Sequence, residues 1–448
     1  MKDFTTGNVT KLILNFTLPM LLGNVFQQLY NIVDSIIVGK VLGKEALASV
    51  GASFPIIFTL IALLIGIGSG FSIVISQFYG AKDINKVKRA IDTMYLFLFG
   101  AGILVSVLGI YFSKDLFLLL QLPVELIPQA TSYLNVYMAG MIMFFGFSGT
   151  SSILRGLGDS KTPLYFLILA SIFNIIFDLL FVMVFKWGIA GAAWATVLAQ
   201  SGAFISGIIY LNRNHNIIKF SLFKLVFDKE IFITSLKIGI PSGIQHTFVA
   251  LGMMALLGIV NTFGTDVIAA YTAAGRIDSL AMMPAMNFSQ AVAAFVGQNL
   301  GANKIDRVRQ GFKVTFIMSN VFCLMMTAII ILFGSHLMKL FTTDANVIAI
   351  GEKYLIIVSS FYLLFSTMFT TNGVLRGAGD TLIPMFITLF SLWLIRIPCA
   401  YFLSSHIEET GIWWSIPIGW SMGTIFSYLY YRTGRWKKKS IVSHQKYS

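Results

Sequence analysis

The sequence predicts an all-α membrane protein with twelve transmembrane helices, arranged as two six-helix bundles. Three observations predict this class: the composition, the spacing of long apolar runs, and an internal repeat. Of the 448 residues, 56% are hydrophobic and only 11% are charged, and the mean hydropathy is +0.81. Soluble chains carry about 25% charged residues, whereas a helix that crosses the hydrocarbon core needs about 20 apolar residues. A soluble two-domain enzyme is therefore excluded.

Twelve apolar runs follow one another, separated by charged residues or by Gly and Pro. The first six form an N-terminal bundle within residues 1–212, at about 12–39, 48–79, 91–112, 126–154, 162–185 and 188–211. The second six form a C-terminal bundle within residues 231–432, at about 231–262, 266–299, 311–333, 347–375, 382–403 and 411–431. Residues 213–230 are the expected cytoplasmic linker, and residues 433–448 form a basic cytoplasmic tail.

The positive charge of the chain, +13, is distributed unevenly between the connections. Counted from the N-terminus, alternate connections hold 24 Lys and Arg, and the opposite connections hold 6. Cytoplasmic loops carry the excess of positive residues, so both termini are expected in the cytoplasm and the protein in the inner membrane. This explanation of the charge makes a nucleic-acid partner unnecessary.

The two halves of the chain repeat each other at an offset of 221 residues. The string Leu-Arg-Gly-Leu-Gly-Asp at 154–159 matches Leu-Arg-Gly-Ala-Gly-Asp at 375–380, and Tyr133 matches Tyr354. Six spans is an even number, so both halves enter the membrane in the same orientation, as in parallel-repeat transporters. A site is then expected between or within the two bundles.

Charged residues inside a span cost at least ~2.5 kcal/mol at a helix centre, so each is a functional candidate. Asp34, Asp178 and Thr196 lie at similar depths, roughly 9 to 12 Å below the outer surface at 1.5 Å per residue. Tyr30 and Asn174 each lie four residues before an Asp, on the same helix face. Together these side chains offer oxygen ligands for a small hard cation. If the acids meet without a cation, one carboxyl group should hold a proton.

The second half lacks this set of residues. Asn174 and Asp178 correspond to Ile395 and Cys399 at the repeat offset. The acids are therefore not a requirement of the shared scaffold. The alternative interpretation is a neutral, buried hydrogen-bonded network that fixes the positions of the helices.

The spans of the second half contain different polar residues. Arg276 and Asp278 are two residues apart, so they lie on different faces of one helix and are not expected to pair. Asp278 either pairs with Arg396 on another span or takes part in substrate or ion binding. Met282 and Met286 are candidates for an adaptable apolar cavity, with lipid-facing or core positions as the alternative.

Two prolines occupy equivalent places in the first span of each half. Pro19 follows Leu18, and Pro241 follows Ile240. A proline inside a helix frees a backbone carbonyl and permits a kink. Pro19 is therefore a candidate hinge, and a static bend is the alternative.

The repeated Arg-Gly-x-Gly-Asp motif, the Gly-Ala pairs at 80–81 and 301–302, and the span-1 string from Leu18 to Gly39 resemble the multidrug and toxic compound extrusion (MATE) family. The resemblance implies two six-helix lobes around a central cavity, which export amphipathic, often cationic, compounds in exchange for Na⁺ or H⁺. It implies a monomer with no catalytic residue and no cofactor beyond the coupling ion, in contact with small organic cations and membrane lipids.

Residue by residue, the resemblance also implies a cation site in the first half. Prokaryotic relatives with such a site use an Asp, an Asn and Asp four residues apart, and a Thr, which match Asp34, Asn174, Asp178 and Thr196. In the Na⁺-coupled subgroup, a cation site in the second half uses a Glu on span 7. At span 7 this chain offers only His246, which is expected to lie in the core. Coupling is therefore expected in the first half.

Two other functions fit the sequence less well. The Gly-x-Gly-Asp string ending at Asp159 resembles an intramembrane aspartyl protease, but Asp159 lies at a cytoplasmic span end, far from Asp34. A flippase for lipid-linked glycans, from the same wider superfamily, would need more cationic residues in its cavity than Arg276 and Arg396. Both functions therefore rank below transport of organic cations.

Overall fold

A computed structural model describes residues 2–214, 220 and 224–442, which form helices joined by short connections, with no β-strand in these ranges. Helices are the expected outcome, because a segment in lipid must satisfy its backbone hydrogen bonds internally. Contacts divide the chain into two compact units. Unit 1 comprises residues 1–2 and Leu18–Gly239, and unit 2 comprises Asp3–Thr17 and Ile240–Ser448. The predicted linker, 213–230, lies partly outside the described residues.

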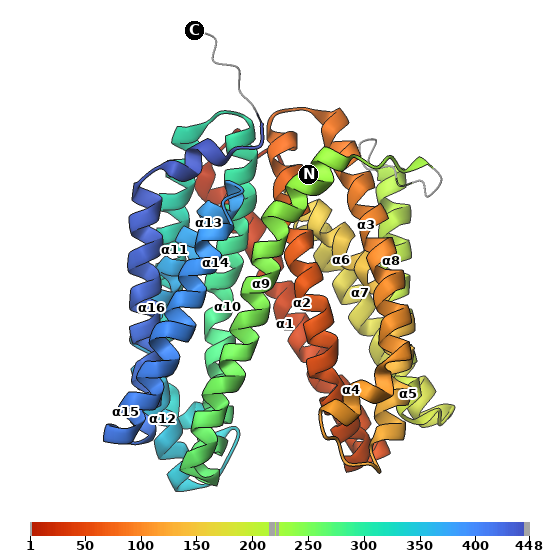
Figure 1. Ribbon diagram of the computed structural model, residues 1–448, viewed down its shortest axis with the longest axis vertical. Coiled ribbons are helices and arrows are strands. Elements are labelled where there is room, and N and C mark those ends of the chain that lie inside the picture. Colours follow the sequence, from red (N-terminus) through yellow and green to blue (C-terminus); the bar gives the residue numbers. More distant parts are fainter. Residues whose placement is uncertain (1, 215–219, 221–223, 443–448) are drawn as a thin grey trace. The chain divides into compact units, whose positions relative to one another are not determined.

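The long helices of unit 1 run side by side (Figure 1). In chain order the helices of the first half are α1 (Val9–Ile37), α2 (Lys44–Gly80), α3 (Ile84–Tyr111), α4 (Ser113–Leu119), α5 (Ile127–Ala139), α6 (Met141–Gly156), α7 (Lys161–Asp178) and α8 (Gly188–Asn214). Two wide π-helical segments, Val38–Leu42 and Leu179–Val184, extend α1 and α7. The short helix α4 was not expected from the sequence.

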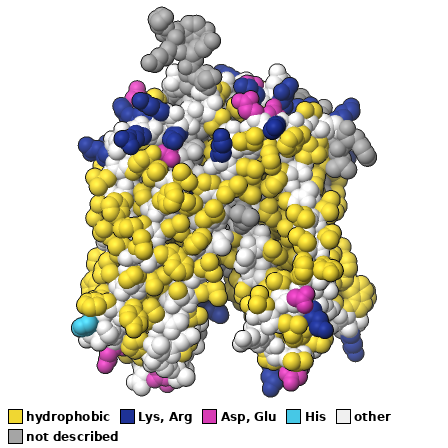
Figure 2. Space-filling view, viewed as in Figure 1, with side chains coloured by type: hydrophobic (Ala, Val, Ile, Leu, Met, Phe, Trp, Pro, Cys, Tyr) yellow, Lys and Arg dark blue, Asp and Glu magenta, His cyan; other side chains and the backbone are white. Residues whose placement is uncertain are grey.

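The helices of the second half follow the same order. They are α9 (Lys229–Val260), α10 (Thr265–Gly301), α11 (Ile305–Lys339), α12 (Ala345–Ser359), α13 (Tyr362–Gly377), α14 (Leu382–Leu389), α15 (Ile397–Ile407) and α16 (Glu409–Arg432). A π-helical segment, Phe390–Arg396, joins α14 to α15. Figure 2 shows hydrophobic side chains along the lengths of the helices and Lys and Arg gathered near helix ends, as expected for spans in lipid.

Two predicted spans are broken rather than continuous. The segment predicted at 126–154 is the pair α5 and α6, bent by 51°, and that predicted at 347–375 is the pair α12 and α13, bent by 49°. The first break lies at Gly140, where an added Cβ would collide with Val197 on α8. Within the described residues, nine helices are long and apolar enough to cross a membrane, or up to eleven with the bent pairs. Helix α16, at the predicted twelfth span, falls outside that set.

The start of α1 belongs to unit 2, although the rest of this helix belongs to unit 1. The backbone N–H of Phe4 donates to Gln298 Oε1 (2.9 Å), and Arg307 donates to the carbonyl oxygens of Phe4 (3.0 Å) and Gly7 (3.1 Å). The Phe4 ring is buried and packs edge-on against Phe16, with centroids 5.2 Å apart. The chain passes into unit 1 between Thr17 and Leu18, next to Pro19.

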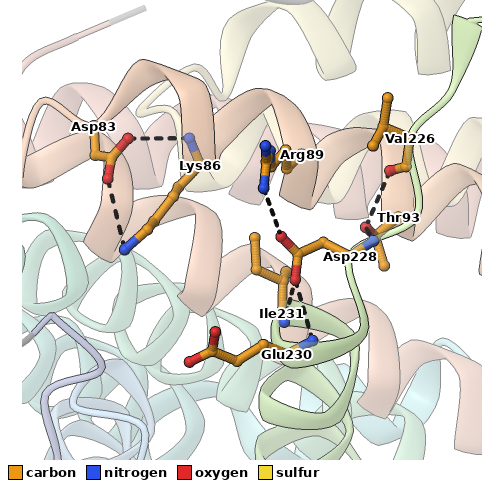
Figure 3. A network of polar contacts seen from close by, with 8 residues as sticks. All are labelled: Asp83, Lys86, Arg89, Thr93, Val226, Asp228, Glu230 and Ile231. Atoms are coloured by element: carbon orange, nitrogen blue, oxygen red, sulfur yellow. Dashed lines mark hydrogen bonds and ion pairs between the residues drawn. The ribbon is translucent and has the colours of Figure 1, made fainter.

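The start of α9 is placed reciprocally, in unit 1 (Figure 3). Asp228 accepts hydrogen bonds from the backbone N–H groups of Glu230 and Ile231, both at 3.1 Å, and so caps α9. Its second oxygen pairs with Arg89 on α3 (3.4 Å), and its own N–H donates to the Thr93 hydroxyl (2.9 Å). The chain passes into unit 2 between Gly239 and Ile240, directly before Pro241. Both passages therefore fall beside a proline.

Candidate functional site

Two acids from different helices meet inside unit 1. Asp34 lies near the end of α1, and Asp178 is the last residue of α7. Their carboxyl groups are within hydrogen-bonding reach of each other. Asp178 is fully buried, and Asp34 is half-buried. The similar depths estimated from the sequence therefore correctly predicted that the two acids could meet.

Each acid directly precedes or lies close to a π-helical segment. Val38–Leu42 follows Asp34 by one turn, Leu179–Val184 follows Asp178 at once, and these two segments pack against each other. π-helical turns inside α-helices are frequent at functional sites. Here they tie the C-terminal end of α1 to the C-terminal end of α7, which holds the two acids in register.

Asn174 and Thr196 complete the contact between α7 and α8. With its amide turned so that both ends are satisfied, Asn174 donates to Asp178 Oδ2 (2.8 Å) and accepts at its oxygen from the Thr196 hydroxyl (3.3 Å). Asn174 and Thr196 are buried, with 2% and 6% of their surface exposed. All four residues expected in the cation site therefore come together; their role in coupling is a proposal developed below.

Tyrosines border the acids. The Tyr30 hydroxyl hydrogen-bonds with Thr196, as its position one turn before Asp34 suggested. Tyr133 and Tyr137 on α5 lie close enough to Asp34 for its carboxyl group to interact electrostatically with their hydroxyl groups. Sequence reasoning missed these two as site residues, although Tyr133 stood out in the repeat. Two features of the sequence could have identified them: Tyr133 matches Tyr354 in the repeat, and the spacing of four residues places Tyr133 and Tyr137 on the same helix face.

Asp34, Asp178, Asn174, Thr196 and Tyr30 form a polar cluster, and two of its carboxyl oxygens have unused capacity to accept a hydrogen bond. Among the described residues, Oδ1 of Asp34 and Oδ1 of Asp178 are buried and have no hydrogen-bond donor. Buried polar atoms are normally satisfied, and two facing carboxyl groups are satisfied by a shared proton or by a cation held between them. A cavity of about 10 Å³, the size of about one water molecule, adjoins the cluster beside Tyr30, Asn174 and Thr196. These oxygen atoms could therefore bind a small hard cation or a proton.

The polar residues of unit 2 are arranged differently from the expectation. Asp278 is buried and accepts hydrogen bonds from Tyr354 and Tyr362. Within the described ranges its carboxylate forms no ion pair with Arg396 at 4.0 Å or less, because the tyrosines occupy the carboxylate. Of the two alternatives for Asp278, the contact ion pair with Arg396 is therefore not formed. Arg276 is exposed and does not pair with Asp278, as expected.

The other candidates of the second half are exposed or partly buried. Met286 is 41% exposed, and Met282 packs partly against the core of unit 2. His246 is exposed on α9, which contradicts its expected place in the core. Their part in substrate binding stays a prediction.

Asp159, the acid of the Gly-x-Gly-Asp string, has a structural role. Its carboxylate accepts from the backbone N–H groups of Lys161 (3.0 Å) and Thr162 (3.1 Å) and from the Thr162 hydroxyl (2.7 Å). It therefore secures the first turn of α7. In the other half, Asp380 accepts from the Tyr430 hydroxyl (2.6 Å).

Comparison with known proteins decides the family. A model of the MatE family matches residues 19–180 and 241–402, one match in each half. The chain belongs to the MATE family. It is thus a multi-pass membrane transporter rather than an enzyme, which sets aside the protease alternative, and the predicted all-α membrane fold is confirmed.

Similar proteins match this MATE chain over nearly its full length. The Bacillus subtilis probable multidrug resistance protein YpnP is 34% identical over 443 residues, which cover 99% of each chain. The Thermotoga maritima probable multidrug resistance protein NorM is 27% identical over 450 residues, which cover 98% of this chain and 95% of that protein. A solved outward-facing structure of a multidrug resistance MATE family transporter is 25% identical, covers 98% of this chain and 99% of that chain, and gives a TM-score of 0.91.

Proposed function

We propose that this MATE protein is an antiporter that exports amphipathic organic cations in exchange for H⁺ or Na⁺. The observation that carries the proposal is the pair of facing carboxyl groups, Asp34 and Asp178, each with a buried oxygen that has no donor among the described residues. A transporter needs a group that binds the coupling cation and releases it, and this pair supplies one. The printed names of the relatives, which describe multidrug resistance, support drugs as the cargo.

The same oxygens serve either coupling ion. Na⁺ would be held by the two carboxylates together with the oxygens of Asn174, Thr196 and Tyr30, because hard cations take oxygen ligands. H⁺ would be held as a single proton shared between Asp34 and Asp178. In both cases the bound cation cancels negative charge that is costly to bury without a partner.

The charge of the cargo follows from the acids inside the membrane-spanning helices. An organic cation in a low-dielectric site needs a counter-charge, and Asp34, Asp178 and Asp278 are the acids available at depth. Aromatic rings add attraction of about 0.5 to 2 kcal/mol for a cation over a ring face. Organic anions lack both kinds of stabilisation and are expected to be poor substrates.

The coupling step is proposed to pass through α1. Its first residues belong to unit 2 and the rest to unit 1, and Pro19 lies beside the passage. A cation bound at Asp34 adds contacts from α1 to α7 and α8 and so favours the conformation in which these contacts form. A drug that favours the other conformation must weaken cation binding by the same factor.

Transport in proteoliposomes with imposed Na⁺ or H⁺ gradients tests this function. Export of a cationic dye should follow one of the two gradients, and Asp34→Asn and Asp178→Asn should each abolish the dependence. Asp115→Asn, a change of an exposed acid on α4, is the matched control. Gradient-driven transport that survives in both site variants at normal protein levels would refute the assigned role.

The placement in the cell is also proposed: a monomer in the inner membrane with both termini in the cytoplasm, supported by the uneven distribution of Lys and Arg. In Arg435→Cys, a change of an exposed residue, the new thiol should resist a membrane-impermeant thiol reagent in intact cells and react after the membrane is opened. Labelling in intact cells would reverse the orientation.

A further inference from the structure

A second carboxyl group lies in the core of unit 2, outside the site described above. Asp278 on α10 is 7% exposed, and both of its oxygens accept a hydrogen bond. The Tyr362 hydroxyl donates to Oδ1 (2.5 Å), and the Tyr354 hydroxyl donates to Oδ2 (3.2 Å). Both tyrosines are buried, with 1% and 3% of their surface exposed. Hydrogen bonds donated to both oxygens stabilise the ionised form of the carboxyl group.

The break between α12 and α13 brings the two hydroxyls to one carboxylate. In a straight helix, residues eight apart are displaced by about 12 Å along the axis and rotated by about 80°. Tyr354 lies in α12 and Tyr362 begins α13, and the two helices are bent by 49°. The bend thus creates a two-donor site that a continuous span would not provide.

The internal repeat gives independent support for a functional site. Tyr354 is the repeat equivalent of Tyr133, which lies beside Asp34 and Asp178 in unit 1. In each unit the equivalent tyrosine is therefore near enough to a buried carboxyl group to interact with it electrostatically. The acids themselves come from non-equivalent helices, because position 57, the counterpart of Asp278, is Ile on α2.

The charge around Asp278 is only loosely compensated. Arg396, in the π-helical segment before α15, is near enough to interact electrostatically but forms no ion pair with Asp278 within the described ranges. The Nε atom of Arg396 is buried and has no hydrogen-bond acceptor in this part of the chain. Tyr271 on α10 and Cys323 on α11 are the further titratable side chains, and they face the two tyrosines.

We propose that Asp278 is a second proton-binding group of this transporter, which loads and unloads a proton during transport. The proton comes from water, adds to one carboxylate oxygen, and leaves to water from the same atom, and no other covalent bond changes. A proton fits better than a metal cation, because the positive Arg396 lies nearby and the carboxylate is enclosed. The site's part in transport rests on the proposed antiport function, whereas its proton binding does not.

Protonation would change the balance of charge in the core of unit 2. With Asp278 neutral, the half-buried Arg396 loses an opposite charge with which it interacts, and a charge inside a membrane-spanning helix is costly without such compensation. The arrangement seen here would then be disfavoured relative to one in which Arg396 reaches water or another partner. This gives the proton a differential affinity for two conformations, the requirement for coupling.

Infrared spectroscopy of the full-length protein in lipid membranes tests proton binding directly. As pH falls, a carbonyl-stretch band of a buried protonated carboxyl group should appear in the wild type, in Asp34→Asn and in Asp178→Asn. That band should be lost in Asp278→Asn. Spectra of Asp278→Asn that retain every titrating band of the wild type would overturn the proposal.

Tyr362→Phe keeps the test decisive if Asp278→Asn fails to fold. Loss of one donor to the ionised carboxylate should move the titration of the band to higher pH, because the charged form loses a charge-assisted hydrogen bond. Tyr401→Phe, a change of a tyrosine on α15 that is 74% exposed, is the matched control and should leave the titration unchanged. An identical titration in wild type and Tyr362→Phe would count against the site.

Transport separates this proposal from the main function. In proteoliposomes, Asp278→Asn should move fewer protons per exported dye molecule than the wild type while the dye is still bound. If Asp34→Asn and Asp178→Asn leave the dependence of transport on H⁺ or Na⁺ as it is in the wild type, the proposed function fails, but the infrared band of Asp278 is unaffected. An unchanged proton count in Asp278→Asn would refute its role in transport.

Discussion

Replacement of Asn174 by Leu should tell the two coupling ions apart, because the sign of its effect differs between them. The Asn174 amide donates to Asp178 Oδ2 at 2.8 Å, and the residue is 2% exposed. Leu has nearly the same size but no donor. A hydrogen bond to a charged group contributes about 1.5–3 kcal/mol, and this contribution is made to the ionised carboxylate.

That free energy corresponds to a factor of about 10 to 150 in affinity, since about 1.4 kcal/mol is tenfold. Na⁺ needs ionised carboxylates and also loses the amide oxygen, so its affinity should fall by at least this factor. A proton competes with the ionised form, so its binding should strengthen, and drug displacement should occur about one to two pH units higher.

Equilibrium binding of a fluorescent organic cation, in membranes, measures both effects. One titration adds Na⁺ at a fixed high pH, and the other lowers the pH without Na⁺. Asn320→Leu is the matched control, because the Asn320 amide donates to the carbonyl oxygen of Phe316 in its own helix, α11. If Asn174→Leu shifts neither titration while the drug still binds, the four-residue cation site is wrong.

Three further outcomes are expected. Pro19→Ala should leave drug binding intact but weaken its dependence on the coupling cation, measured in the same titrations; an unchanged dependence would remove the proline from the mechanism. Anionic analogues of an exported dye should be transported far more slowly than the cation in proteoliposomes, and equal rates would contradict the charge argument. Asp228→Ala removes the cap of α9 and should destabilise the protein by about 1 kcal/mol in thermal unfolding, whereas Asp306→Ala, a change of an exposed acid, should have little effect.

The sequence was sufficient for the geometry of the acid pair because that geometry depends on regular helices. Asn174 and Asp178 share a face at a spacing of four residues, and the nearest charged residue outside the span gives the depth of each acid. Tyr133 and Tyr137 were missed for a physical reason. They follow the unexpected helix α4 and precede the bend at Gly140, so neither their depth nor their direction follows from counting residues along a straight span.

The contact of Asp278 with the tyrosines was unpredictable for a related reason. The sequence suggested opposite charges as partners, and Arg396 is the basic residue at depth on a neighbouring span. Burial of tyrosine hydroxyls creates a competing demand, because each hydroxyl needs an acceptor inside the core. The bend between α12 and α13 lets two of them reach one carboxylate, and hydrophobic patterns carry no signal for such a bend.

The sequence also did not predict that α1 begins in unit 2 and α9 begins in unit 1. This arrangement explains why the two prolines occupy equivalent positions. Backbone hydrogen bonds run from each residue to the fourth before it, so Pro19 and Pro241 each remove one bond across the turn where the chain passes between units. Bending costs least where a bond is already missing. The half of α1 that carries Asp34 is therefore attached to unit 2 through its most easily bent turn. Under the proposed function, a cation that fixes α1 to α7 and α8 would act inside unit 1, and we expect it to affect the other unit through that turn.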